Sequence, residues 1–420
     1  MTPATLKSSR HNRSDSPHIC IVGGGFGGLY TALYLQKYRH LRNSRITLIE
    51  PKARFLFTPM MYELITDELK DWEIAPTYSG LIAGSNIEWQ QSKAESLDLE
   101  QQRVTLADGR VVAYDYLVSA TGAKSRPVDI PGVDEHALTF RSFEDSVTLK
   151  LRLAQLVQSQ ELATTGATAE AVAVTVIGGG ASGVELAGKV SDYLGENGRI
   201  TLVERGPRLL KPFPKGLRRQ ATRALAQRNV EVLTETGVSE VGADFVTLQA
   251  NQSQRTVPSH LTLWAVGTQP NPWLGEQSVA HNDYGQRLSR RSLQLPGYDN
   301  VFVLGDGADV RGPKQQLAPN TAQAAFQAAS RVAANLAAMT KGKPPKPFNY
   351  LHLGDMITLG VGDAGLSSFG ITIGGWLAAL CRRGVYVFRM PTRQHQLKVG
   401  RRALGELVSW LARALKPNFL

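Results

Sequence analysis

Two glycine-rich stretches of this chain have the residue types and the spacing of a dinucleotide-binding turn. The stretches are "ICIVGGGFGGLYTAL", with Gly23, Gly25 and Gly28, and "VTVIGGGASGVELAG", with Gly178, Gly180 and Gly183. In the G-x-G-x-x-G pattern, the first glycine permits a tight turn and the second lets the backbone approach a pyrophosphate. The third lets the helix pack closely on the strand, with the helix N-terminus directed at the anion. The chain is therefore predicted to bind two dinucleotides.

An acidic residue follows each turn at the distance that a ribose site requires. Glu50 ends "RITLIE", 22 residues after Gly28, and Glu204 ends "RITLVE", 21 residues after Gly183. A carboxylate at the end of the second strand of a βαβ unit holds a ribose diol. The simplest interpretation places FAD on the first unit and a nicotinamide nucleotide on the second, which gives the flavin a hydride.

The residues around Glu204 leave the choice between NADH and NADPH open. Glu204 favours NADH, because a carboxylate bonds the 2′-OH and repels a 2′-phosphate. Arg205 follows directly and Arg208 is close, so a 2′-phosphate could be neutralised.

These turns need strands and helices on both sides, which predicts an α/β fold with two Rossmann-like dinucleotide-binding domains. The second domain is inserted in the first, because the strand in "NVFVLGDGADV" and a helix from about Thr321 come after the second unit has ended. The predicted parts are a disordered tail (1–17), a discontinuous FAD-binding domain (18–140 and 276–345), an NAD(P)H-binding domain (141–275) and a C-terminal segment (346–420).

Smaller signals mark individual elements. Asp108-Gly109 predicts a hairpin turn between "RVTL" and "RVVAYDYLVSATG". Ser142 and Asp145 form a variant capping box that opens a helix. Residues 55–76 are expected to form a loop and a short helix.

The cysteines exclude several kinds of flavoenzyme. The chain has only Cys20 and Cys381 and no Cys-x-x-Cys pair. Thioredoxin reductase, glutathione reductase and sulfide:quinone reductase chemistry all need paired reactive thiols. The count also predicts no disulfide framework and fits a reducing compartment. The polar N-terminus lacks the apolar region of a secretory signal, and no apolar run reaches the roughly 18 residues of a transmembrane helix.

The C-terminal segment combines positive charge with an apolar stripe. The last forty residues carry a net +8 of the chain's +11. The stripe follows helical spacing and consists of Leu404, Leu407, Val408, Leu411 and Leu415. This combination predicts a helix lying on an anionic membrane surface. Packing on the protein's own core or on a second copy, in a homodimer, remains the alternative. The charges belong to no recognisable nucleic-acid-binding module.

Further motifs carry a family resemblance. "SATG" (119–122), "AVGTQPN" (265–271) and "LGDGA" (304–308) resemble the two-dinucleotide-binding-domain flavoproteins. "AQAAFQ" (322–327) resembles the quinone-site motif of type II NAD(P)H:quinone oxidoreductases. "FLFTPMMYELITDELKDWEIAP" (55–76) and "RMPTRQHQLKVG" (389–400) resemble the demethylphylloquinone reductase branch of cyanobacteria and plastids.

The resemblance implies a role for individual residues. The first glycine turn, Glu50, Thr121, Gly122 and Asp306 would hold FAD, and the second turn, Glu204 and Arg205 would hold NADPH or NADH. Glu185 would lie close to the nicotinamide or the quinone. Gln323 and Gln327, four residues apart on one helix face, would donate to quinone carbonyls.

The resemblance also implies an activity and a location. The enzyme would reduce a lipid-soluble prenyl naphthoquinone with NAD(P)H, without pumping protons. It would be a peripheral protein on the cytoplasmic or stromal face of a thylakoid or plasma membrane. Two other functions stay open: a soluble FAD-dependent reductase of a ferredoxin-like protein, whose acidic surface the +11 charge would suit, and a flavin-based redox sensor.

Overall fold

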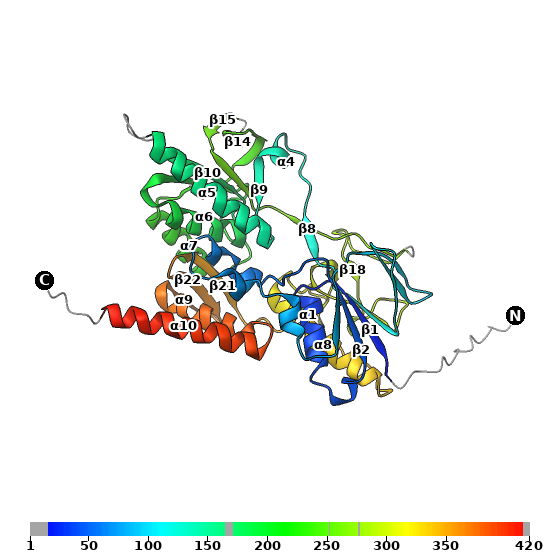
Figure 1. Ribbon diagram of the computed structural model, residues 1–420. Coiled ribbons are helices and arrows are strands. Elements are labelled where there is room, and N and C mark those ends of the chain that lie inside the picture. The colour runs from blue at the N-terminus through cyan, green and yellow to red at the C-terminus, as the bar shows by residue number, and fades with distance from the viewer. Residues whose placement is uncertain (1–15, 164–170, 252, 276–277, 415–420) are drawn as a thin grey trace. The chain divides into compact units, whose positions relative to one another are not determined.

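The computed structural model describes residues 16–163, 171–251, 253–275 and 278–414. The chain divides into two compact units (Figure 1). Unit 1 contains Met1–Ala53, Thr77–Lys124 and Gln269–Leu351, and unit 2 contains Arg54–Pro76, Ser125–Thr268 and His352–Leu420. These bounds differ from the predicted domains, because residues 54–76 and the C-terminal segment both belong to the unit that holds the second glycine turn.

A five-stranded parallel sheet forms the core of unit 1. The strand order is β19-β7-β1-β2-β3. The strands are β1 (His18–Val22), β2 (Arg45–Ile49), β3 (Ile87–Gln90), β7 (Tyr116–Ser119) and β19 (Val301–Val303). Helices α1 (Phe26–Leu35) and α8 (Ala322–Met339) pack against each other (Figure 1). Thr321 caps α8, as its hydroxyl oxygen accepts from the amide of Ala324 at 3.2 Å, so the predicted start of this helix is confirmed.

Shorter elements complete unit 1. They are η1 (Arg39–Leu41), α3 (Tyr78–Ile82), β4 (Ala94–Asp98), β5 (Arg103–Leu106), β6 (Val111–Ala113), β18 (Arg287–Leu288), η4 (Gly305–Gly307) and β20 (Ala308–Asp309). Strands β5 and β6 pair antiparallel across Asp108-Gly109, which confirms the predicted hairpin. β8 (Ala123–Ser125) pairs with β17 (Thr268–Pro270), and β18 pairs with β20.

Unit 2 repeats the parallel arrangement, with strand order β12-β11-β10-β16-β9. The elements are β9 (Ala137–Thr139), β10 (Val172–Ile177), β11 (Gly198–Val203), β12 (Glu231–Leu233), β16 (Leu261–Trp264), α4 (Val133–His136), α5 (Phe143–Ala163), α6 (Ala181–Leu194), η3 (Gly195–Asn197) and α7 (Lys215–Gln227). The predicted capping box is present before α5. Asp145 donates its amide to the Ser142 hydroxyl at 3.0 Å and accepts from the Ser142 amide at 3.1 Å. The stretch "ATTGATAEA" (163–171), whose composition indicates a linker, falls largely outside the described residues.

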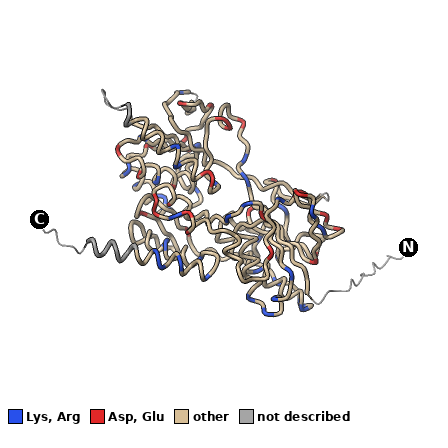
Figure 2. The backbone as a smooth tube through the Cα atoms, viewed as in Figure 1, with Lys and Arg blue, Asp and Glu red and all other residues tan. Residues whose placement is uncertain are grey.

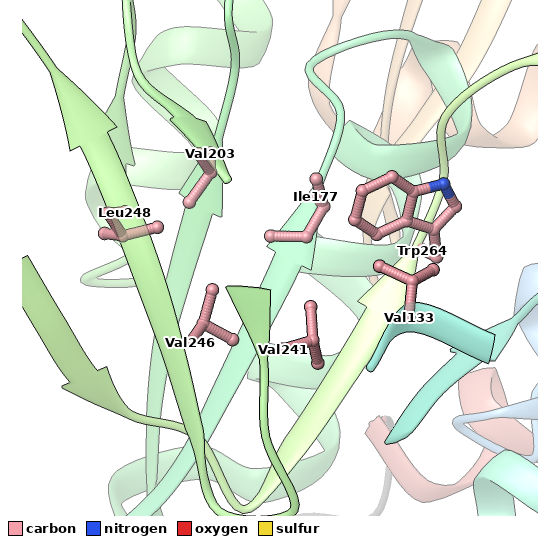
Figure 3. Packing of buried hydrophobic residues seen from close by; sticks show 7 residues of the cluster. All are labelled: Val133, Ile177, Val203, Val241, Val246, Leu248 and Trp264. Atoms are coloured by element: carbon pink, nitrogen blue, oxygen red, sulfur yellow. The ribbon is translucent and has the colours of Figure 1, made fainter. Parts of the chain in front are cut away.

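A second, antiparallel sheet covers part of the parallel sheet in unit 2. It consists of β13 (Gly237–Val241), β14 (Phe245–Ala250) and β15 (Ser253–Pro258). Valine and leucine side chains of β13 and β14 point toward Ile177, Val203 and Trp264 of the parallel sheet (Figure 3). Their burial fixes the three-stranded sheet on the parallel one.

The C-terminal part of the chain begins with a sheet that the sequence did not predict. Strands β21 (Asp355–Gly360), β22 (Asp363–Ser368) and β23 (Ile371–Gly374) pair antiparallel and pack on α6 and α7. At Gly188 of α6 a Cβ atom would collide with the carbonyl group of Leu359, so glycine allows this close packing. Helices α9 (Gly375–Arg389) and α10 (Arg393–Ala414) follow.

Residues 54–76 form a segment whose two ends are hydrogen-bonded to each other. They contain η2 (Thr58–Leu64) and α2 (Asp71–Ile74), as the sequence suggested. The two ends meet, because Phe55 donates its amide to the Pro76 carbonyl at 3.0 Å and Phe57 donates to Ile74 at 2.7 Å. Within the described ranges, no helix combines the length and apolar character needed to cross a membrane.

Candidate functional site

The first glycine turn joins β1 to α1 in unit 1. Gly23 has φ of +98°, which side chains rarely adopt, and a Cβ on Gly28 would overlap the carbonyl oxygen of Gly23. Gly25 differs from both. It is exposed, its φ is −67°, and no atom of the described chain lies within 4 Å of a Cβ built there. Gly23 and Gly28 therefore shape the turn, whereas Gly25 leaves open space at the N-terminus of α1, which suits an anion.

Glu50 fixes this turn from the end of β2. Its carboxylate accepts from the amide of Gly24 at 2.7 Å and from the amide of Lys52 at 3.0 Å. Tyr78 donates its hydroxyl to the carbonyl of Gly24 at 2.8 Å. Glu50 thus lies beside the glycine turn, at the carboxyl edge of the sheet where Rossmann domains bind ribose.

The second glycine turn repeats these features in unit 2. Gly178 has φ of +112°, and a Cβ on Gly183 would overlap the Gly178 carbonyl oxygen. Gly180 is exposed and has φ of −74°, and a Cβ added to it would meet no described atom within 4 Å. The Glu204 carboxylate accepts from the amides of Gly179 at 2.7 Å and Gly206 at 2.5 Å.

Arg205 and Arg208 are exposed on the loop that follows Glu204. Both arginines lie within four residues of Glu204, the acid that follows β11. This placement is compatible with the predicted neutralisation of a 2′-phosphate.

Two further motifs of the flavoprotein resemblance are joined by Asn271. Its side-chain amide donates to the carbonyl of Thr121 at 2.6 Å, and its backbone amide donates to the carbonyl of Gly122 at 3.0 Å. Thr121 follows β7 and Asp306 lies in η4 after β19, and these two strands are neighbours in the sheet. The carboxyl edge of unit 1 therefore brings Gly25, Glu50, Thr121 and Asp306 to one side of the sheet.

The two glutamines of α8 have different surroundings. Gln327 donates its amide to the carbonyl of Leu351 at 2.8 Å and accepts from the Leu351 amide at 2.9 Å. Gln323 accepts from the hydroxyl of Tyr350 at 2.8 Å. Gln327 therefore anchors the chain after α8 through one of its two N–H groups and its oxygen, and its predicted donation to a quinone stays a prediction.

Glu185 lies in a buried polar cluster of unit 2, on α6. Its carboxylate accepts from the amide of Thr358 at 3.0 Å and lies 3.8 Å from the Arg382 guanidinium. Arg382 also pairs with Glu63 and donates to the carbonyl of Pro59 at 2.5 Å. Burial raises the pKa of Glu185 to about 7, although Arg382 and the Thr358 amide act in the opposite direction.

Glu63 and Arg382 are partners of Glu185 that the sequence did not identify. Both side chains are buried, at 5% and 4% exposed. Glu63 comes from η2 and Arg382 from α9, 319 residues apart. The aromatic ring of Tyr386 lies 5.0 Å from the Arg382 guanidinium, and burial raises the pKa of Tyr386 to about 12.

The two stretches of the narrower resemblance contact each other. Glu73, from residues 54–76, pairs with Arg402, and its carbonyl lies 2.7 Å from Nε2 of His395 on α10. Trp72 packs edge-on against His395 and lies under the ammonium group of Lys398. These contacts hold α10 against residues 54–76, so the two stretches of the narrower resemblance pack together.

The two cysteines lie in different units of the chain. Cys20 and Cys381 are free thiols. Burial in β1 raises the pKa of Cys20 above its usual range, which keeps this thiol protonated and unreactive.

Comparisons with known proteins agree with this architecture. Residues 17–329 match a family model described as pyridine nucleotide-disulphide oxidoreductase. A demethylphylloquinone reductase from Synechocystis sp. is 42% identical over 405 residues, covering 95% of this chain and 96% of that protein. An alternative NAD(P)H-ubiquinone oxidoreductase from Arabidopsis thaliana is 31% identical, covering 95% of this chain and 81% of the relative.

Solved structures show the same fold at lower identity. NDH2 from Plasmodium falciparum in complex with NADH has a TM-score of 0.80 at 18% identity, covering 91% of this chain and 97% of that one. A sulfide:quinone oxidoreductase from Aquifex aeolicus has a TM-score of 0.73 at 24% identity, covering 90% and 92%.

The family match and the curated relatives indicate FAD and NAD(P)H as the cofactors, and the open second glycine of each turn fits two dinucleotides. The chain therefore belongs to the pyridine nucleotide-disulphide oxidoreductase family and, within it, to the NAD(P)H:quinone oxidoreductases that include demethylphylloquinone reductase.

Proposed function

We propose that the protein uses FAD to transfer two electrons from NAD(P)H to a membrane prenyl quinone, without pumping protons. The main observation behind this proposal occurs once in each unit: a glutamate carboxylate accepts a hydrogen bond from an amide of the glycine turn. The identity of 42% with a demethylphylloquinone reductase supports demethylphylloquinone as the substrate. Plastoquinone-like benzoquinones are the second class of substrate to test.

Unit 1 is the proposed FAD site. The N-terminus of α1 would bind the pyrophosphate and Glu50 the adenosine ribose, and Thr121, Gly122 and Asp306 would hold the ribityl–flavin half. When bound, FAD accepts a hydride from the nicotinamide and passes two electrons to the quinone. The chain's own part is to position the cofactors and to exchange protons.

Unit 2 is the proposed NAD(P)H site, with the N-terminus of α6 facing the pyrophosphate and Glu204 at the ribose. Arg205 is assigned to a 2′-phosphate, which favours NADPH over NADH. Glu185 is proposed to exchange protons during quinone reduction, because a carboxyl group with a pKa of about 7 can donate and accept near neutral pH. Gln323 and Gln327 are both proposed as donors to quinone carbonyls, Gln327 through the N–H that does not bond Leu351.

Turnover with defined acceptors tests this proposal. We expect one FAD per chain after denaturation, and NAD(P)H oxidation that is fast with a prenyl naphthoquinone in liposomes and at least about tenfold slower with a ferredoxin. The ratio kcat/KM should be higher with NADPH, and the Cys20→Ser, Cys381→Ser double variant should keep its turnover. FMN or no flavin would refute the cofactor, a preference for ferredoxin would indicate the soluble reductase, and the absence of turnover would favour a redox sensor.

The proposed membrane contact is the apolar face of α9 and α10. It consists of Trp376, Leu377, Leu380 and Phe388 on α9 and Leu397 and Leu404 on α10, all exposed. Lys and Arg residues lie along the described part of α10 (Figure 2). Exposed apolar residues beside cations are the features of a helix that binds an anionic interface.

The structure narrows the predicted set of membrane-binding residues. Arg382 and Arg402 pair with Glu63 and Glu73, so these two cations are not available to lipid. Arg393, Lys398 and Arg401 are exposed and remain available. Of the predicted stripe, Leu404 is exposed, the side chains of Leu407, Val408 and Leu411 are not described, and Leu415 lies outside the described residues.

A double substitution on this face tests the membrane contact without removing the β21–β23 sheet. Trp376 and Phe388 are 73% and 79% exposed, so W376S/F388S should fold normally. We expect it to lose at least about tenfold in affinity for anionic liposomes, because two large apolar side chains no longer enter the interface. Flotation measures the affinity, and Y284S, at a 77% exposed aromatic position of unit 1, is the matched control. Equal flotation of both variants would place the contact elsewhere.

A further inference from the structure

A buried arginine lies next to the proposed flavin path and belongs to none of the recognised motifs. Arg287 forms strand β18 and is paired with Ala308 of β20, directly after the η4 turn that contains Asp306. Its side chain is only 5% exposed. In the sequence it stands in "GQRLSRRS", a polar stretch that resembles an ordinary surface loop.

The contacts of Arg287 leave one end of the guanidinium group without a partner in the described part of the chain. Nη2 donates to the carbonyl of Asn271 at 2.5 Å, and the guanidinium carbon lies 5.7 Å from the ring centre of Trp273. Nη1 is buried and has no hydrogen-bond partner among the described residues. Burial lowers the pKa of Arg287. A buried cation of this kind is costly unless an anion or a strong acceptor joins it.

Nη1 faces the carboxyl edge of the unit 1 sheet. A Cβ atom placed on Gly307 would lie 3.7 Å from Nη1, 3.7 Å from the Thr121 hydroxyl and 3.3 Å from the Gly122 carbonyl. Nη1, the Thr121 hydroxyl and the Gly122 carbonyl therefore all lie close to Gly307, which follows β19. Asn271, which binds the Arg287 guanidinium, also binds Thr121 and Gly122.

The strand order indicates which half of FAD would pass this point. Glu50 ends β2 and Gly25 follows β1, and these hold the adenosine and the pyrophosphate in the proposed site. Strands β7 and β19 lie on the other side of β1, one and two strands away, or about 5 and 10 Å at the usual strand spacing. The ribityl chain and the flavin ring must extend in that direction, toward Arg287.

We propose that Arg287 is a flavin-binding residue whose Nη1 donates to the ribityl–flavin half of FAD and whose positive charge stabilises the negative charge that the flavin gains on reduction. This inference rests on the proposed placement of FAD in unit 1. A fixed charge near the flavin ring is one of the means by which a protein sets the reduction potential of this cofactor. The bound FAD in turn supplies the acceptor that the buried Nη1 lacks.

The test is the midpoint potential of the bound flavin in R287M and R287K. We expect R287M to bind reduced FAD at least tenfold less tightly relative to oxidised FAD, which lowers the two-electron potential by about 30 mV. R287K keeps the charge and should retain most of the potential, while FAD dissociates faster because one ammonium group cannot replace the two guanidinium nitrogens that bind Asn271 and FAD. R290M is the matched control, since Arg290 is exposed and pairs with Asp299.

The possible outcomes distinguish a failure of the role of Arg287 from a failure of the proposed FAD site. Wild-type protein purified without FAD would refute the proposed cofactor site itself. An unchanged potential in R287M and R287K, with equal losses of thermal stability with and without FAD, would show that Arg287 is purely structural and overturn the inference. If R287M loses FAD completely while its apoprotein melts like the wild-type apoprotein, the binding role is supported. The effect on the flavin potential is then measured on R287K.

Discussion

Gly180→Ala should leave the protein folded and loaded with FAD but lower kcat/KM for NAD(P)H by at least about tenfold, or about 1.4 kcal/mol. The φ of −74° and ψ of −174° at Gly180 suit alanine, and a Cβ there meets no described atom within 4 Å. The methyl group would instead occupy the space through which a pyrophosphate approaches the backbone. Steady-state kinetics with varied NAD(P)H measure the loss, and FAD content and melting temperature should match the wild type.

Gly183→Ala provides the contrast within the same turn. Its Cβ would overlap the Gly178 carbonyl oxygen, so this change should destabilise unit 2 by about 1–3 kcal/mol or more before any ligand is added. The same contrast is expected in the first turn. G25A should lose FAD but leave the apoprotein stable, whereas G28A should lower the stability of the apoprotein. A normal KM in G180A would show that no pyrophosphate lies against this turn.

The parts of the fold that the sequence predicted depend on neighbouring residues. The glycine turns, the acids Glu50 and Glu204, and the Ser142–Asp145 capping box each act over a few residues or within one βαβ unit. Strand periodicity and backbone sterics are sufficient to identify them. The order of the elements also predicted that one unit interrupts the other, whereas the structure divides each unit into three segments that alternate along the chain.

The features that the sequence missed depend on long-range partners. Glu63 and Arg382 carry no local signal of their contact, since each charge is compatible with an exposed helix face. Gln327 fits the spacing of a ligand-binding pair, and only the backbone of Leu351 shows that its amide is already bonded. The β21–β23 sheet contains short strands with glycines and exposed apolar residues, and its burial against α6 and α7 decides its structure.

Arg382→Met should cause the largest loss of stability among single substitutions in the buried cluster of unit 2. Removing one partner of a buried ion pair leaves the other charge uncompensated and costs about 3–5 kcal/mol. Here two carboxylates, Glu63 and Glu185, would lose their shared cation. Urea denaturation followed by circular dichroism measures the change. R382K should lose less, and R393M, at an exposed position of α10, should lose almost nothing.

The loss in R382M should grow with pH. The folded-state pKa of Glu185, about 7, lies above its ordinary value of 4.5, so the folded protein keeps this proton longer than the unfolded chain. The stability contribution of the group is therefore present at low pH and is lost as the pH rises through about 7. Arg382 opposes the shift, so its removal raises the pKa of Glu185 further and enlarges the penalty above pH 7. R382M should accordingly lose more stability at pH 8 than at pH 5.5, and adding Glu185→Gln, whose amide oxygen can still accept from Thr358, should restore part of the loss at pH 8. Equal losses at both pH values, or no rescue by Glu185→Gln, would mean that Arg382 supports Glu63 alone and leaves the protonation of Glu185 unaffected.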